Sequence, residues 1–376
     1  MLALEAPVDS LPWDWLNPVA HTSHGKSGQR SCLRDLLRFL FALSILVLVW
    51  PRCAHARNME PANLPARSRQ RGTPEAGQRV FVSPRFVPGQ TLRYEMEFQT
   101  TSANSRSGMV TDPEGPSKLV ITWDATVRLA VLPAAASPPG SIRIRTTYEK
   151  SVASVRSDTF APGANAIERD YRRLAGKVVE FTLDARGNVI SVSGLENLVH
   201  GKNAMRAARA WIAQLAAGPG APPGGVTIGQ RWGSTQPAES LPVAGMVWRT
   251  VSDYVGNEPC RSPSPAAPDS ANHSTASETC AVIQTDLELV RSKKVRNPTP
   301  REYSKKGVRT AGKWTGSGES LSYISLKTGF VVSVTQTADE NMDVQFTTSQ
   351  GDLFRYSGTI HSRSQIALDP DELARK

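Results

Sequence analysis

The stretch KLVITWDATVRLAVL, from Lys118 to Leu132, decides the fold class of this chain. Every second residue from Leu119 to Val131 is apolar, and polar residues such as Asp124 and Arg128 lie between them. A period of two residues is that of a β-strand, whose successive side chains point to opposite faces. One apolar and one polar face are typical of an antiparallel strand with one face in the core and the other in water.

The same alternation occurs on both sides of this stretch, in TLRYEMEF at 91–98 and in SIRIRTTY at 141–148. The three segments predict a meander of at least three strands. A short helical candidate follows at 164–174. The segment KVVEFTLDARGNVISV at 177–192 then predicts a β-hairpin, because Gly187 supplies the positive φ that its turn needs.

The second half of the chain is again rich in strand patterns. These are MVWRTVSDYV at 246–255, AVIQTDLELV at 281–290, ESLSYISLKTGFVVSV at 319–334 and LFRYSGTI at 353–360. Strands that follow one another without alternating helices favour an antiparallel sheet over a parallel one. The fold class expected is therefore mainly β, with a large antiparallel, curved or half-barrel sheet.

One substantial helix is expected to pack on this sheet, at 195–217, where apolar residues recur at helical spacing. A Gly/Pro linker follows it at 218–225. The β-rich domain is expected to span 80–365, with a polar tail at 366–376. Its parts at 80–194 and 226–365 also show a weak internal echo, so they are either two related halves or two hairpins that share turn chemistry.

The start of the chain has the pattern of a secretory signal. An apolar run from Phe39 to Trp50 follows two arginines and precedes Ala54-His55-Ala56. This order predicts an atypically long N-region and signal peptide at 1–56, with cleavage after Ala56. The run is short for a membrane span, although an uncleaved anchor is the alternative. The Pro/Arg-rich segment 57–79 is expected to be a disordered spacer, and the protein is expected to be secreted or periplasmic.

Cysteine use agrees with export. Cys32 and Cys53 would leave with the signal, so Cys260 and Cys280 remain. An even pair in an oxidising compartment predicts a disulfide, and two free thiols are the alternative. Two cysteines without paired histidines nearby fall short of a zinc site, and no metal site is expected.

A basic segment, residues 291–313, contains nine Lys or Arg and one acid, Glu302, so it carries most of the chain's formal net charge of +10. We expect it to contact an anionic surface or lipid of the cell envelope. Export and the single aromatic residue, Tyr303, disfavour nucleic acid. A solvated connector is the alternative. The basic residues are Arg291, Lys293, Lys294, Arg296, Arg301, Lys305, Lys306, Arg309 and Lys313.

Several segments resemble exported bacterial β-rich proteins of unknown function. They are FVPGQTLRYEMEF at 86–98, FTLDARGNVISVSG at 181–194, VTIGQRWGS at 226–234 and GSGESLSYISLKTGFVVSV at 316–334. The architecture, long antiparallel strands with a helix, is also similar to the lipoprotein-carrier fold of the bacterial envelope. These resemblances imply a fold and carry over no catalytic or ligand-binding residue.

No catalytic residue or cofactor is expected. Beyond residue 56 the only histidines are His200, His273 and His361, and nothing in the sequence places one of them beside a nucleophile. Ser320 lies in GESLS, which lacks the final Gly and the following helix of a nucleophile elbow. Neither a phosphate-binding loop nor a dinucleotide fingerprint occurs.

A pair of acids on one strand, Glu95 and Glu97, has a simpler explanation than catalysis. Both are expected on a polar strand face, opposite Arg143 and Arg145.

The leading functional hypothesis is therefore non-catalytic binding of an apolar or amphipathic envelope component, on the sheet under the 195–217 helix. A structural or protein-interaction module of the envelope is the alternative, followed by an unrecognised hydrolase.

Overall fold

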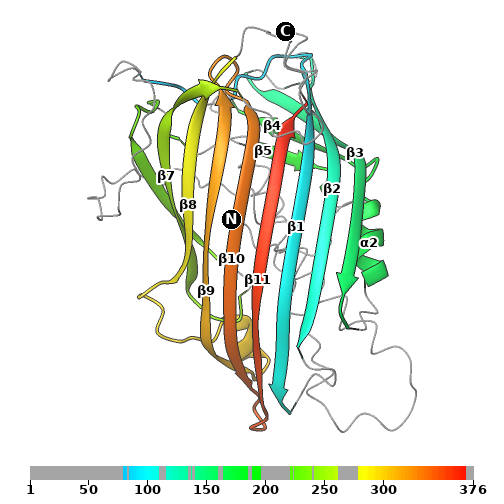
Figure 1. Cartoon of the computed structure of the whole chain (residues 1–376), viewed down its shortest axis with the longest axis vertical. Helices are drawn as coiled ribbons and strands as arrows, with labels where there is room; N and C mark the ends of the chain where they lie inside the picture. Colours follow the sequence, from blue (N-terminus) through cyan, green and yellow to red (C-terminus); the bar gives the residue numbers. More distant parts are fainter. Residues whose placement is uncertain are drawn as a thin grey trace.

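The structure is a computed structural model, and it describes residues 79–82, 84–109, 116–133, 137, 140–159, 164–184, 189–195, 221–222, 224–238, 241–260 and 278–369. Most of these residues belong to a single antiparallel sheet of 11 strands, which is not closed (Figure 1). The strands are β1 (Thr91–Gly108), β2 (Ser117–Val131), β3 (Ile142–Ser157), β4 (Val178–Leu183), β5 (Val189–Ser193), β6 (Arg231–Pro237), β7 (Met246–Pro259), β8 (Thr279–Arg291), β9 (Arg309–Ser325), β10 (Val331–Thr347) and β11 (Leu353–Leu368).

The first and last strands meet in the middle of this sheet. The strand order is β5-β4-β3-β2-β1-β11-β10-β9-β8-β7-β6, so each half of the chain is a meander that starts or ends at the centre. Figure 1 shows β1 and β11 side by side there. Their register runs from Tyr94 opposite Leu368 to Gly108 opposite Phe354. The expected meander of β1 to β3 and the hairpins β4–β5 and β9–β10 are confirmed.

The two faces of the sheet differ as the alternation predicts. On β2, Ile121, Trp123 and Ala125 are buried, whereas Asp124 and Arg128 are exposed on the opposite side. We call the face that carries Trp123 the inner face and the opposite face the outer face. The hydrophobic core lies on the inner face, and charged side chains cover much of the outer face.

Helices are short in the described part of the chain. They are α2 (Ala164–Arg172), of nine residues, and α4 (Arg301–Lys305), of five. The helix α2 confirms the helical candidate at 164–174. The single substantial helix is not borne out there: of the expected 195–217 helix only Leu195 is described. None of the described helices is long and apolar enough to cross a membrane.

The helix α2 is fixed to the inner face by a hydrogen bond and a ring contact. The Ser151 hydroxyl on β3 donates to the carbonyl of Tyr171 at 2.7 Å, and it accepts the Trp123 Nε1–H at 2.9 Å. The Trp123 and Tyr171 rings also pack together, with centroids 5.4 Å apart. The buried indole N–H therefore has a hydrogen-bond partner, and the indole ring packs against Tyr171 of the helix.

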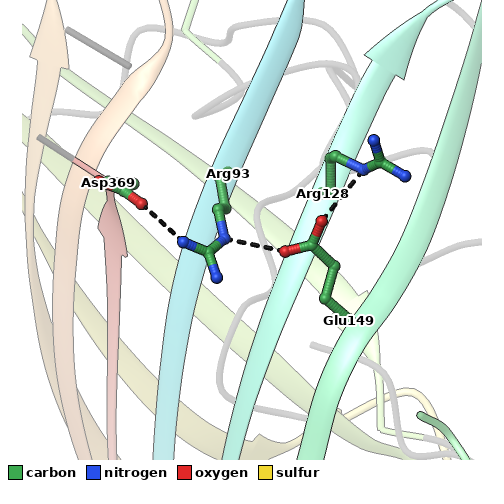
Figure 2. Close-up of polar contacts among 4 residues, drawn as sticks. All are labelled: Arg93, Arg128, Glu149 and Asp369. Atoms are coloured by element: carbon green, nitrogen blue, oxygen red, sulfur yellow. Dashed lines mark hydrogen bonds and ion pairs between the residues drawn. The ribbon is translucent and has the colours of Figure 1, made fainter. Parts of the chain in front are cut away.

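The outer face carries ion pairs that cross the strands (Figure 2). Arg93 on β1 contacts Glu149 on β3 at 2.8 Å and Asp369 after β11 at 3.1 Å, and Arg128 on β2 contacts the same glutamate at 3.1 Å. This network joins the strands on both sides of β1. Because these side chains are partly exposed, each pair contributes only about 0.2–1 kcal/mol.

The expected partners of Glu95 and Glu97 are wrong. Both glutamates lie on the outer face of β1, but β2 separates that strand from β3. Arg143 and Arg145 instead pair with Glu180 on β4, at 3.1 and 2.6 Å. A cross-strand pair depends on which strand is the neighbour, and alternation within one strand does not give that order.

The expected disulfide is confirmed, between Cys260 and Cys280. It lies at the ends of the paired strands β7 and β8, and the segment between the two cysteines lies mostly outside the described residues.

At the C-terminus, β11 continues to Leu368, three residues beyond the domain end expected at 365. The expected signal peptide, spacer and Gly/Pro linker lie wholly or mostly outside the described residues.

Candidate functional site

A row of short polar side chains crosses the middle of the inner face. Strand register places its members side by side on five consecutive strands. All of them are at least nine-tenths buried. They are Ser252 on β7, Thr285 on β8, Ser320 on β9, Gln336 on β10 and Ser364 on β11. We call this row, with the buried Thr100, Ser102, Ser322 and Ser362 beside it, the polar band.

Four hydroxyl groups of the polar band have no hydrogen-bond partner among the described residues. They belong to Thr100 and Ser102 on β1, Ser322 on β9 and Ser364 on β11, and each residue is at most 5% exposed. A buried hydroxyl group without a partner costs about 1–3 kcal/mol. Native proteins leave few such groups, so four in one region require an explanation.

Other members of the polar band are satisfied within the sheet. The Ser252 and Thr285 hydroxyls share a hydrogen bond of 2.9 Å, and the Ser362 hydroxyl donates to the Ala338 carbonyl at 3.4 Å. Three of the four unpaired hydroxyls of the polar band therefore lie on β1 and β11, and the fourth, Ser322, lies on β9.

Three hydrophobic clusters surround the polar band. The α4 cluster includes Trp248, Leu289, Tyr303, Trp314, Met342 and Phe346. The α2 cluster includes Met96, Phe98, Trp123, Ile167, Tyr171 and Ile366. The Tyr254 cluster comprises Val82, Val226, Tyr254, Ala281, Ile283 and Ile324 as its buried members. Buried apolar side chains thus lie on both sides of the polar band.

One carboxyl group lies at the border of the polar band and the α4 cluster. Glu340 on β10 is 4% exposed, and it is the one charged residue among the buried residues of the described chain. The Trp314 Nε1–H donates to its Oε2 at 2.8 Å. Burial raises the pKa of Glu340 to about 7, and the indole hydrogen bond offsets part of that rise.

Gly316 makes room for an indole ring beside this carboxyl group. It lies opposite Glu340 in the register of β9 and β10. A Cβ atom at Gly316 would lie 3.0 Å from Cη2 of Trp248 and 3.1 Å from Cγ of Glu340. Trp248 therefore reaches Gly316, opposite Glu340, and Trp314 contacts the Glu340 carboxyl group itself.

The basic segment 291–313 is anchored to the same end of the inner face. Tyr303 of α4 is 4% exposed, and its ring lies 6.0 Å from that of Phe346. The Thr310 N–H donates to the Thr299 hydroxyl at 3.0 Å, and the Ala244 N–H donates to the Pro298 carbonyl at 2.7 Å. These contacts argue against a loosely attached loop. The basic side chains are exposed, apart from Lys306, which is half-buried.

The candidate nucleophile and base do not come together. His361 Nδ1 contacts Asp339 Oδ1 at 2.7 Å, but both side chains are more than half exposed on the outer face. Ser320 is buried on the inner face, so the sheet separates it from His361. His200 and His273 lie outside the described residues. In the described ranges, no three His, Cys, Asp or Glu side chains gather as a metal site would require.

Sequence reasoning did not find the polar band, although one signal of it was present. In GSGESLSYI at 316–324 the inward positions are Gly316, Gly318, Ser320 and Ser322, so apolar residues are missing from the face that should be buried. Small polar residues at core positions indicate either a solvated face or a functional one. Only the strand register shows that such positions line up across five strands.

Comparisons with known proteins show no family for this chain. No protein-family model matches it, and no curated protein matches it. The solved structures that resemble it include lipovitellin, in a structure concerned with lipid–protein interactions, with a TM-score of 0.38 and 9% identity over 76% of this chain and 25% of that one. The chain thus spans a quarter of the length of the lipovitellin chain.

Two outer-membrane proteins show weaker likeness. OprG from Pseudomonas aeruginosa has a TM-score of 0.17 and 6% identity, covering 75% of this chain and 97% of that one. The COG4313 outer membrane channel from Pseudomonas putida F1 has a TM-score of 0.17 and 8% identity, covering 76% and 97%. Because these scores are low, the likenesses carry no argument about function, which must be argued from the inner face itself.

Proposed function

We propose that this protein binds an amphipathic molecule of the cell envelope, without chemical change, on the inner face of its sheet. The observation that carries the proposal is the set of unpaired, buried hydroxyls of Thr100, Ser102, Ser322 and Ser364, with apolar clusters around them. Polar atoms of a ligand would satisfy the hydroxyls, and its apolar part would pack among the side chains of the clusters.

The energetic cost of the polar band supports this proposal over a purely structural role. A sheet face that served only as core would be more stable with apolar side chains of similar volume, because removing both polar partners from a core is nearly neutral or stabilising. Each unpaired buried group calls for an explanation, and a bound ligand is one that accounts for several adjacent groups together. Pockets for small molecules combine apolar walls with a few polar groups in this way.

The proposed setting is the cell envelope, in a secreted or periplasmic protein. The signal pattern before residue 57 and the disulfide between Cys260 and Cys280 support it. The anchored basic segment supports contact with an anionic surface at the end of the inner face that holds the α4 cluster. Such contact would bring the inner face close to envelope components.

The test compares Thr100→Val with Thr101→Val. Valine has nearly the shape of threonine, and Thr101 lies on the outer face of the same strand. Protein purified from its native host is examined by native mass spectrometry for bound molecules, and urea unfolding is measured on the ligand-free protein. We expect Thr100→Val to lose the bound molecule and to unfold at a higher urea concentration, since an unpaired buried hydroxyl is removed.

The control Thr101→Val should retain the bound molecule. If wild-type protein carries no small molecule and Thr100→Val changes only stability, the inner face is a core and the structural or protein-interaction module is the correct function. Loss of the molecule from both variants would also contradict the proposed site.

A further inference from the structure

We propose that the polar group received by this site is an amine that is positively charged at neutral pH, and that Glu340 is its counter-charge. This inference rests on the proposed function and specifies the chemical class of the ligand. It follows from the geometry around Glu340, which takes part neither in the basic segment nor in the ion pairs of the outer face.

The first step is the lack of a counter-charge for Glu340 within the described chain. Its neighbours in register are Gly316 on β9 and Ile360 on β11, and Ala338 and Met342 precede and follow it on the inner face of β10. Trp314 and Trp248 approach it from β9 and β7. None of these side chains ionises near neutral pH. Burial raises the pKa of Glu340 and the indole hydrogen bond lowers it, and no ion pair joins Glu340 to another described residue.

The second step is the hydrogen-bonding character of the groups nearby. Ser102 follows Ile360 in the same cross-strand row as Glu340, and Thr100 lies in the next row, opposite Ser362. Neighbouring strands lie about 4.8 Å apart, so Ser102 is about 10 Å from Glu340 between Cα atoms. A carboxylate only accepts hydrogen bonds, and an unpaired hydroxyl can accept. An ammonium group has three donors and no acceptor, so it can pair with the carboxylate, while Ser102, beyond Ile360, would accept from another donor of the ligand.

The third step is the aromatic surface. Trp248 and Trp314 are each 3% exposed; the Trp314 N–H donates to Glu340, and Cη2 of Trp248 lies over Gly316, which is opposite Glu340 in register. The carboxyl group therefore lies in a desolvated environment, where it attracts an organic ammonium group more strongly than it would in water. An anionic group at the same place would face the buried carboxyl without compensation.

The experiment uses the purified ligand-free protein and three probes with the same dodecyl chain or its acyl equivalent: dodecylammonium, neutral monolauroylglycerol and dodecanoate. Affinities are measured below the micelle concentration, at about pH 6 and about pH 8. If the ammonium group pairs with an ionised Glu340, binding releases one proton, and its affinity should rise about tenfold over this interval. The affinity for dodecanoate should fall as the pH rises.

Glu340→Gln should remove both pH dependences and weaken dodecylammonium binding at about pH 8 by about tenfold or more. The matched control is Glu97→Gln, an exposed outer-face glutamate on β1, which should behave as the wild type. The pH series on wild-type protein tests the inference even if Glu340→Gln folds poorly.

Equal affinity for all three probes at both pH values would overturn the role of Glu340 but leave the proposed function intact. Tighter binding of dodecanoate than of dodecylammonium at about pH 8 would do the same. Failure of every probe to bind would count against the proposed function itself.

Discussion

At the scale of single residues, Glu340 should couple the stability of the ligand-free protein to pH. Its carboxyl group titrates near 4.5 when unfolded, and burial raises its pKa to about 7 in the folded state. The folded state therefore binds this proton more tightly. The stability that the protonated group confers is complete below pH 4.5 and is lost as the pH rises to about 7.

We therefore expect Glu340→Gln to flatten this dependence. The difference between the two pKa values corresponds to about 3 kcal/mol. Between about pH 4 and about pH 8, the wild-type protein should therefore lose up to that much free energy of unfolding that Glu340→Gln does not lose. Urea unfolding of both proteins at the two pH values measures it. Glu97→Gln, with an exposed side chain, should follow the wild-type curve, and a parallel curve for Glu340→Gln would mean that its carboxyl group is not buried.

The sequence could not have identified Glu340 as the special acid. Along β10, Gln336 and Glu340 share the inward phase with Ala338, but polar residues at several positions hide the alternation. Its burial depends on Trp248 and Trp314, which come from other strands, and on Gly316, whose missing side chain makes room for an indole. These contacts depend on the tertiary structure, whereas the alternation within β1 alone was enough to place Glu95 and Glu97 on its polar face.

At the scale of elements, the basic segment is a surface held in place at both ends and at α4. Replacing Lys293, Lys294, Lys305 and Lys306 by Gln should weaken binding to vesicles that contain anionic lipid. Each basic side chain near such a surface contributes about 1 kcal/mol before salt screening, so we expect a loss of at least about tenfold at low salt. Vesicle sedimentation at two salt concentrations measures the effect.

The control changes two exposed lysines elsewhere, Lys150 and Lys177, to Gln. It should bind anionic vesicles almost as wild type does. Equal binding by the fourfold variant and the wild type would leave the basic segment as a connector with no surface contact. Binding that does not decrease with salt would also contradict an electrostatic contact.

Strands were the most predictable elements, because alternation identifies a strand that has one buried face. This holds for β1, β2 and β8, where apolar residues keep one phase. Predictability failed where the inner face turns polar. On β9 the start at Arg309 was missed, since Gly312, Gly316 and Gly318 interrupt the pattern. The small residues that obscured the strand pattern of β9 include the ones that line the candidate site.

At the scale of the whole molecule, the strand order repeats between the two parts of the chain. Read in one direction, β5-β4-β3-β2-β1 and β10-β9-β8-β7-β6 have the same succession. In each part a short helix follows the third strand, α2 after β3 and α4 after β8. This order adds support to the proposal of two related halves, 80–194 and 226–365. The last strand of the second half, β11, has no counterpart in the first half and lies between β1 and β10.

The position of β11 argues that the two parts fold as one unit. It pairs with β1 on one side and with β10 on the other along most of its length. Without it, β1 and β10 would each be an edge strand. Independent unfolding of one part would expose the whole of that seam. Cooperative units coincide with continuous packing, and here the packing continues across the centre of the sheet.

The corresponding prediction concerns Ile283→Ala on β8, at a fully buried position far from β2 in the strand order. The cavity should lower the global free energy of unfolding by about 2–5 kcal/mol. If unfolding is cooperative, the slowest-exchanging amide hydrogens of β2 and β8 should lose the same free energy of protection, as measured by native-state hydrogen exchange. The control Val152→Ala, at a largely exposed position on β3, should change neither. Loss of protection in β8 alone would show that the two parts unfold separately, in which case the seam joins two domains that are each stable without the other.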